Sequence, residues 1–105
     1  MSDTSKAILN GVKYYTYGDK LVGTSYTQTY GLDNSTRDSI LDMLKEKVSN
    51  EKYHMWVFMD VDFKNNTSMV YEIYNNNKID TKEYDFIVSR ALNIMPDIES
   101  RLLNS

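Results

Sequence analysis

The stretch from residue 53 to residue 74, YHMWVFMDVDFKNNTSMVYEIY, constrains the fold more than any other part of the sequence. Apolar side chains alternate along it on both sides of a short polar segment, which predicts a β-hairpin rather than a helix. Side chains of a strand point to its two faces in turn. One face of the first predicted strand therefore carries Met55, Val57, Met59, Val61 and Phe63.

The other face of this strand has an unusual composition. It carries two large aromatic residues, Trp56 and Phe58, followed by two carboxylates, Asp60 and Asp62. We expect the aliphatic face to form the core, because all five of its side chains are apolar. The aromatic face is then expected to be exposed.

The register of this hairpin follows from the polar residues at its tip. A three-residue loop of residues 64–66, with Asn66 in the left-handed conformation, places Val61 opposite Met69. It also sets Trp56 beside Tyr74 on the exposed face. A two-residue turn would place polar side chains opposite the apolar ones, because a one-residue slip changes every pairing.

Length and composition indicate a single domain over residues 1–105, with residues 1–6 expected to be frayed. Cysteine is absent, so no disulfide or thiolate site is expected. The sequence has no apolar run that could span a bilayer, and we expect a cytoplasmic protein without membrane contact. The net charge of −3 makes nucleic-acid binding an unfavoured hypothesis.

A second hairpin is predicted before the central one. The segments VKYYTY and LVGTSYTQTY are rich in Tyr, Thr and Val, and they flank Gly18-Asp19. A type II′ turn with Gly18 first would pair Tyr15 with Val22 and Tyr14 with Gly23. The Tyr14 ring would then lie across Gly23, or the strand would bulge there.

Two amphipathic helices complete the pattern. Ser35-x-x-Asp38 resembles a capping box and predicts a helix through about Ser49. Asp80-x-x-Glu83 predicts the start of the second helix. The expected buried stripes are Ile40, Leu41, Met43, Leu44 and Val48 in the first helix and Tyr84, Ile87, Val88, Ala91, Leu92 and Met95 in the second.

The second helix is expected to kink or restart at Pro96. Ile98 and Leu102 continue the apolar spacing beyond the proline, so we expect the C-terminus to pack.

These elements predict an α+β fold of order β-β-α-β-β-α. A two-layer sandwich is the simplest arrangement that buries one apolar face of four antiparallel strands and the apolar stripes of two helices. We therefore expect a four-stranded antiparallel sheet with both helices on one face. The strand order is left open.

Side chains that could support chemistry are few. His54 has no nucleophile motif near it, so a hydrogen-bonded or surface histidine is expected. Asp60 and Asp62, with Glu72 on the neighbouring strand, are the only candidates for a metal site, but alternating acids are also typical of a solvent-facing strand. No catalytic residue, metal site or cofactor is predicted, and an enzyme is not expected.

The aromatic residues instead predict an interaction surface. An exposed patch of large rings is typical of an interface, and Tyr and Trp are the commonest hot-spot residues. If the sheet curls, some of these rings would complete the core, and a homodimer would also cover them. The predicted partner-binding residues are Trp56, Phe58 and Tyr74 of the central hairpin and Tyr14, Tyr15, Tyr17 and Tyr26 of the first.

The favoured hypothesis is a small non-catalytic protein-binding module. It would act as an inhibitor or antagonist, of the phage anti-defence or immunity type, by blocking the surface of a partner protein. The alternative is a binder of nucleotides or single-stranded nucleic acid that stacks bases on an open aromatic sheet face. The third hypothesis is a metal-dependent enzyme that uses Asp60 and Asp62.

Overall fold

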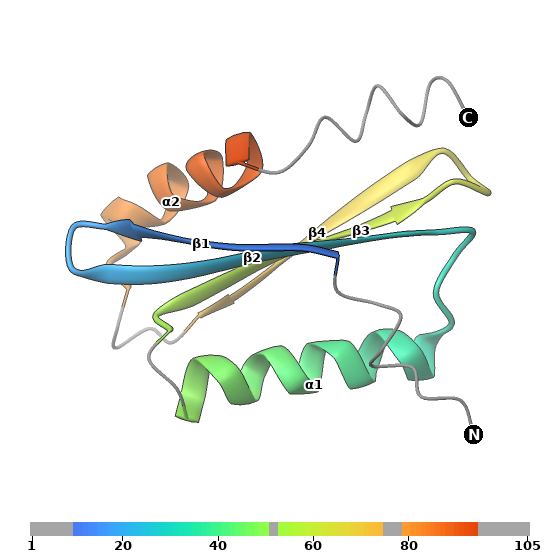
Figure 1. Ribbon diagram of the computed structural model, residues 1–105, viewed down its shortest axis with the longest axis horizontal. Helices are drawn as coiled ribbons and strands as arrows, with labels where there is room; N and C mark the ends of the chain where they lie inside the picture. Colours follow the sequence, from blue (N-terminus) through green and yellow to red (C-terminus); the bar gives the residue numbers. More distant parts are fainter. Residues whose placement is uncertain (1–9, 51–52, 75–78, 95–105) are drawn as a thin grey trace.

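The computed structural model describes residues 10–50, 53–74 and 79–94, which form four strands and two helices (Figure 1). This content confirms the α+β class. In chain order the elements are β1 (Asn10–Tyr17), β2 (Lys20–Thr29), α1 (Asn34–Asn50), β3 (Met55–Asp62), β4 (Thr67–Tyr74) and α2 (Thr81–Ile94). Neither helix of this described part is long and apolar enough to cross a membrane.

The sheet has the order β1-β2-β3-β4 and is mixed. Strands β1 and β2 are antiparallel, as are β3 and β4, but β2 and β3 run parallel, so the predicted purely antiparallel sheet is wrong. The cause is the length of α1. Its 17 residues span about 26 Å, and the 8 residues of β3 span about the same distance. The helix therefore returns the chain to the end where β2 began.

The two helices lie on opposite faces of the sheet, so the molecule has three layers (Figure 1). The prediction that both helices cover one face is wrong. The physical reason is that β3 is buried on both sides, with apolar residues at consecutive positions from Met55 to Met59. Such an uninterrupted run is typical of a strand covered on both faces, and a strand of this kind needs a helix on each.

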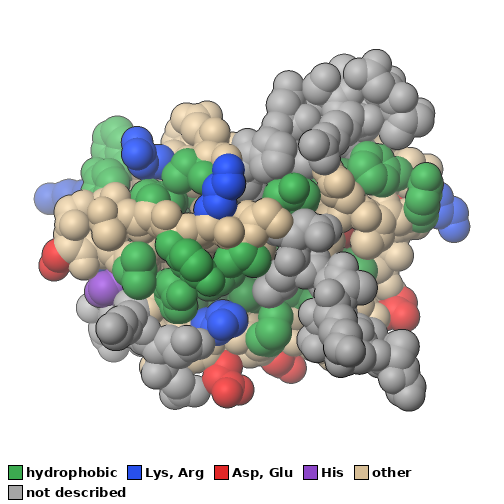
Figure 2. Space-filling model, in the orientation of Figure 1, with side chains coloured by type: hydrophobic (Ala, Val, Ile, Leu, Met, Phe, Trp, Pro, Cys, Tyr) green, Lys and Arg blue, Asp and Glu red, His purple; other side chains and the backbone are tan. Residues whose placement is uncertain are grey.

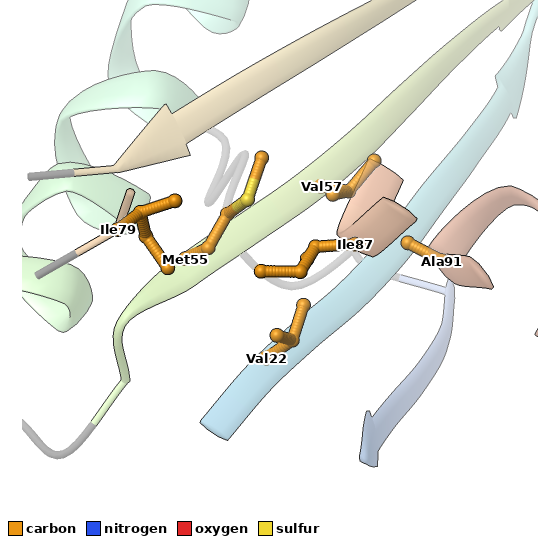
Figure 3. Packing of buried hydrophobic residues seen from close by; sticks show 6 residues of the cluster. All are labelled: Val22, Met55, Val57, Ile79, Ile87 and Ala91. Carbon is orange, nitrogen blue, oxygen red and sulfur yellow. The ribbon is translucent and has the colours of Figure 1, made fainter. Parts of the chain in front are cut away.

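The face covered by α2 holds an aliphatic core (Figure 3). Ile87 of the helix points between the side chains of β2 and β3, and Ala91 follows it one turn later. The buried members of this cluster are Val22, Met55, Val57, Ile79, Ile87 and Ala91.

The face covered by α1 holds an aromatic core. Trp56 and Phe58 of β3 pack against the predicted stripe of α1, whose buried residues are Ile40, Leu44 and Val48. The Trp56 ring lies over Gly23 of β2, where an added Cβ would come within 2.3 Å of the ring. The ring that crosses Gly23 is thus Trp56 rather than Tyr14.

The first hairpin has the predicted register. Tyr15 is paired with Val22 and Tyr14 with Gly23, and Gly18 has a φ of 61°, as the first position of a type II′ turn requires. The strand does bulge, but earlier, between Asn10 and Lys13.

The central hairpin is shifted by one residue from the predicted register. Val61 pairs with Ser68 rather than Met69, and Trp56 pairs with Ile73 rather than Tyr74. The connection is longer than predicted because the Asp62 carboxylate accepts hydrogen bonds from the backbone N–H groups of Lys64 and Asn65. The left-handed conformation of Asn66 is confirmed, with a φ of 54°.

The two helices begin with aspartate caps. The Asp33 carboxylate accepts the N–H of Thr36 at 2.7 Å, so Asp33 caps α1 and the prediction of Ser35 is wrong. Asp80 caps α2 as predicted, by accepting the N–H of Lys82. The predictions for residues 1–6, Met95, Pro96, Ile98 and Leu102 lie outside the described residues.

Candidate functional site

Trp56 and Phe58 are buried, with exposed fractions of 1% and 0%. The exposed aromatic sheet face that was predicted around them does not exist, because α1 covers it. The shifted register also separates Tyr74 from Trp56. Tyr74 is paired with Met55 and lies on the α2 face, where its ring contacts that of Tyr84 at 5.0 Å. It keeps an exposed fraction of 39%.

A chain of aromatic rings leads from this buried core to the surface beside β1. The Trp56 ring contacts Tyr53 edge-on at 5.2 Å, and Tyr53 stacks on Tyr14 at 5.4 Å. Tyr14 is 53% exposed. The Nζ of Lys47 lies 5.9 Å from the Trp56 ring, within the range of a cation–π contact. The buried end of the chain is fixed by the Trp56 indole N–H, which donates to the Ser25 hydroxyl at 2.9 Å.

The remaining predicted tyrosines, Tyr15, Tyr17 and Tyr26, lie partly buried against the α2 core. The Tyr15 hydroxyl donates to the Ile87 carbonyl at 2.6 Å. Burial raises the pKa of Tyr15 to about 12, and the nearby Arg90 charge acts in the opposite direction. The Arg90 guanidinium lies over the Tyr15 ring at 5.6 Å. Tyr15 therefore joins β1 to α2 and holds a fixed position.

Phe86 of α2 was not predicted as a surface residue, yet it is 65% exposed. It precedes Arg90 by four residues, so both side chains lie on the same side of the helix. Because Arg90 covers Tyr15, that side is the one next to β1. The sequence contained a signal for this position, since Phe86 falls outside the apolar stripe of α2.

These residues form one surface along the outer strand of the sheet. We define the β1 edge patch as Tyr14, Tyr15, Tyr17, Phe86 and Arg90. Figure 2 looks onto this side of the molecule and shows hydrophobic side chains on both sides of the β1 backbone, with Lys and Arg side chains among them. Of the predicted partner-binding residues, the structure brings Tyr14, Tyr15 and Tyr17 together here.

The three carboxylates considered for a metal site do not converge. Asp60 is 6% exposed and faces α1, where its Oδ2 lies 3.6 Å from Arg37 Nε and its Oδ1 accepts the Thr27 hydroxyl. Asp62 is the last residue of β3, and hydrogen bonds led by that of the Asn65 amide lower its pKa. No group of three His, Cys, Asp or Glu side chains suited to a metal occurs in the described part of the chain.

Glu72 lies on the opposite face from Asp60, because β4 pairs it with Val57. Its carboxylate accepts the Tyr84 hydroxyl at 2.7 Å. Burial, followed by this hydrogen bond, raises the pKa of Tyr84. Glu72 therefore anchors α2 to the sheet, and its environment is that of a structural carboxylate.

His54 occupies the junction of the two hairpins. Its Nδ1 accepts the Leu21 N–H at 3.0 Å, and its own backbone N–H donates to the Leu21 carbonyl at 2.8 Å. The hydrogen-bonded histidine expected from the sequence is thus observed. A ring nitrogen that already accepts a backbone hydrogen bond is engaged in structure rather than available as a base.

The chain was compared with known protein families, curated proteins and solved structures. No protein-family model matches the chain, and no curated protein or solved structure is significantly similar to it.

Proposed function

We propose that this chain is a small non-catalytic protein-binding module that uses the β1 edge patch to cover the surface of a partner protein. Its action would be that of an inhibitor or antagonist, because a domain of 105 residues can block a larger protein's site simply by occupying it. The immunity-type or phage anti-defence role expected from the sequence is one form of this action.

The observation that carries the proposal is the exposure of large apolar side chains around one edge strand. Tyr14 and Phe86 retain more than half of their surface in solvent. Exposed aromatic residues next to an arginine have the composition of a binding hot spot. Tyr15 supports this surface as a rigid element, since its hydroxyl and its ring are both held by α2.

The alternative of base stacking on an open sheet has less support than before. It requires a flat, exposed aromatic face, and the rings that would provide it, Trp56 and Phe58, lie under α1. The third hypothesis loses its carboxylate pair, since Asp60 is bound to Arg37 and Thr27. No observation on the described residues favours either function over protein binding.

The proposal is tested by quantitative affinity capture from the cells in which the chain acts. Wild-type protein and the variants Tyr14→Glu and Phe86→Glu are immobilised at equal density. We expect a defined protein to be retained by the wild type and lost with either variant. The captured protein is then purified, and its activity should fall with increasing amounts of wild-type chain but not of the variants.

Tyr30→Glu is the matched control, because Tyr30 is also exposed but follows the far end of β2, where its ring lies near Phe63. Thermal unfolding verifies that all variants are folded. Retention of the same proteins by all four chains would exclude the β1 edge patch as the binding surface. Capture without any effect on the partner's activity would exclude the inhibitor role.

A further inference from the structure

Strand β1 is an edge of the sheet, and the direction of its backbone groups can be assigned. The Leu21 N–H and C=O both bond to His54, so this residue of β2 faces β3. Backbone groups of successive strand residues point to opposite sides. Lys20 and Val22 therefore face β1, and their partners Tyr17 and Tyr15 face β2.

The intervening residues of β1, Tyr14 and Thr16, consequently direct their N–H and C=O groups away from the sheet. In residues 10–50, 53–74 and 79–94 no strand pairs with this side of β1. The stretch 13–17 is regular, since the bulge lies before Lys13 and the turn begins after Tyr17. An unpaired regular edge of this kind is a template for one more strand.

Side chains on both sides of this edge would contact an added strand. Tyr14, stacked on Tyr53, lies on the α1 side. Tyr15 and Tyr17 lie on the α2 side, with Phe86 and Arg90 above them. Alternate side chains of an incoming segment would therefore meet aromatic surface on either face, which is how strand addition obtains specificity.

The charges beside the edge select the kind of segment. Lys13 lies on β1 itself, Arg90 lies over Tyr15, and Lys47 lies beside the Trp56 ring. Lys47 is connected to this edge through Trp56, whose ring also contacts Tyr14. The carboxylates at the turn end of β1, Asp19 and Glu83, are both paired with Lys20. A second copy of the chain would add the same three cations to the seam, where like charges repel. An acidic segment would be attracted by all three.

We propose that β1 binds an extended acidic segment of the partner protein, which joins the sheet as a fifth strand. The segment pairs with the outward N–H and C=O groups of Tyr14 and Thr16, places its apolar side chains on the aromatic surface, and places its carboxylates near Lys13, Lys47 and Arg90. This inference rests on the proposed function and specifies how the β1 edge patch engages its partner.

The probe is a library of random linear peptides of about 12 residues, long enough to cover the regular part of β1. Peptides selected on the immobilised wild-type chain are synthesised, and their dissociation constants are measured. We expect Asp and Glu to alternate with apolar residues in these peptides, and affinity to decrease with added salt. We also expect amide hydrogen exchange at Tyr14 and Thr16 to slow when the peptide binds.

The decisive variants are Thr16→Pro and Thr16→Val. Proline removes one outward N–H and is tolerated on an edge strand, whereas valine keeps that N–H and the strand conformation. We expect Thr16→Pro to weaken binding by about tenfold or more and Thr16→Val to change it little. If Thr16→Pro does not fold, the exchange measurement on the wild type decides the question by itself.

The outcomes separate the binding mode from the function. Peptides that lose affinity with Tyr14→Glu but cause no slowing of exchange at Tyr14 and Thr16 would overturn strand addition and leave the proposed function standing. Peptides unaffected by both Tyr14→Glu and Thr16→Pro would count against both. Failure to select peptides, selection of basic ones, or a concentration-dependent dimer in sedimentation that is lost in Thr16→Pro would overturn the acidic-segment proposal.

Discussion

The two faces of the sheet solve the same packing problem in different ways. On the α1 side, β3 contributes the large rings of Trp56 and Phe58, and the neighbouring positions of β2 are Gly23 and Ser25. On the α2 side, β3 contributes Met55 and Val57, opposite Val22 and Thr24. On the α1 side, the large rings of β3 therefore lie next to small side chains of β2. On the α2 side, the paired side chains of the two strands are of similar, medium size.

This difference shows where each face is sensitive to substitution. The aromatic face depends on a few large residues and on one glycine that makes room for them. The aliphatic face distributes its packing over smaller side chains and adds hydrogen bonds from Tyr15 and Tyr84 to hold α2 in place. Substitutions on the two faces should therefore differ in their effect on stability.

Trp56→Ala is expected to have the largest effect. Removing a fully buried ring between β2 and α1 should lower the free energy of unfolding by about 4 kcal/mol, since the cavity cannot close completely. Phe86→Ala is the matched aromatic control and should change it by less than about 0.5 kcal/mol. Urea denaturation measures both. Equal losses would show that Trp56 is not a core residue.

Gly23→Ala tests the space beneath the same ring. The added methyl group would lie 2.3 Å from Trp56, so the ring must move, at a cost of about 3 kcal/mol in the free energy of unfolding. Trp56→Leu removes the obstacle, and Gly23→Ala should cost much less in that background. A double-mutant cycle checks this coupling. Strictly additive effects would contradict the proposed collision.

Asp60→Asn tests a buried charge on the α1 side of the sheet. Among the described residues, Asp60 is the only charged one that is buried. The substitution leaves Arg37 without its carboxylate partner and should lower the free energy of unfolding by about 2 kcal/mol. Asp38→Asn, on the exposed side of α1, should have little effect. A similar stability of the two variants in urea would show that the Asp60–Arg37 pair contributes nothing.

Tyr15→Phe tests the hydrogen bond that holds the aliphatic side. At neutral pH the variant should be less stable than the wild type by about 1 kcal/mol, the usual value of one hydrogen bond. Because burial raises the pKa of Tyr15 from 10.0 to about 12, the unfolded chain loses this proton first as the pH rises. Wild-type stability should therefore fall between these two values.

The phenylalanine variant cannot titrate at this position, so its stability should fall less steeply over the same pH range. The gap between the two proteins should narrow as the pH rises from 10.0 to about 12. Denaturation at a series of pH values measures this. A gap that stays constant would show that the Tyr15 hydroxyl titrates equally in the folded and unfolded chains.

Local pattern was sufficient for several features of the fold. The type II′ turn at Gly18, the register of the first hairpin and the cap at Asp80 were all predicted, because each depends on residues within a few positions of one another. The buried stripe of α1 was also predicted from its helical spacing. The candidate site was recovered only in part, since Tyr14, Tyr15 and Tyr17 were predicted but Phe86 and Arg90 were not.

The features that were missed depend on residues far apart in the sequence. The alternation in β3 separated two sets of side chains correctly, yet it could not say that both sets would be covered. The register of the central hairpin was missed because the Asp62 carboxylate stabilises a loop longer than the predicted residues 64–66. Phe86 and Arg90 join Tyr15 only because α2 packs next to β1.

The strands, the helices and most of their ends follow from local residue pattern, because the periods of two and 3.6 residues are properties of the local backbone. The direction of β3 and the face that each helix covers are set by packing between distant segments. Those choices depend on how α1 spans the sheet and on where two apolar surfaces find room to pack, and these are relations between distant segments. They bury Trp56 and make β1 the outer strand of the sheet in the described part of the chain.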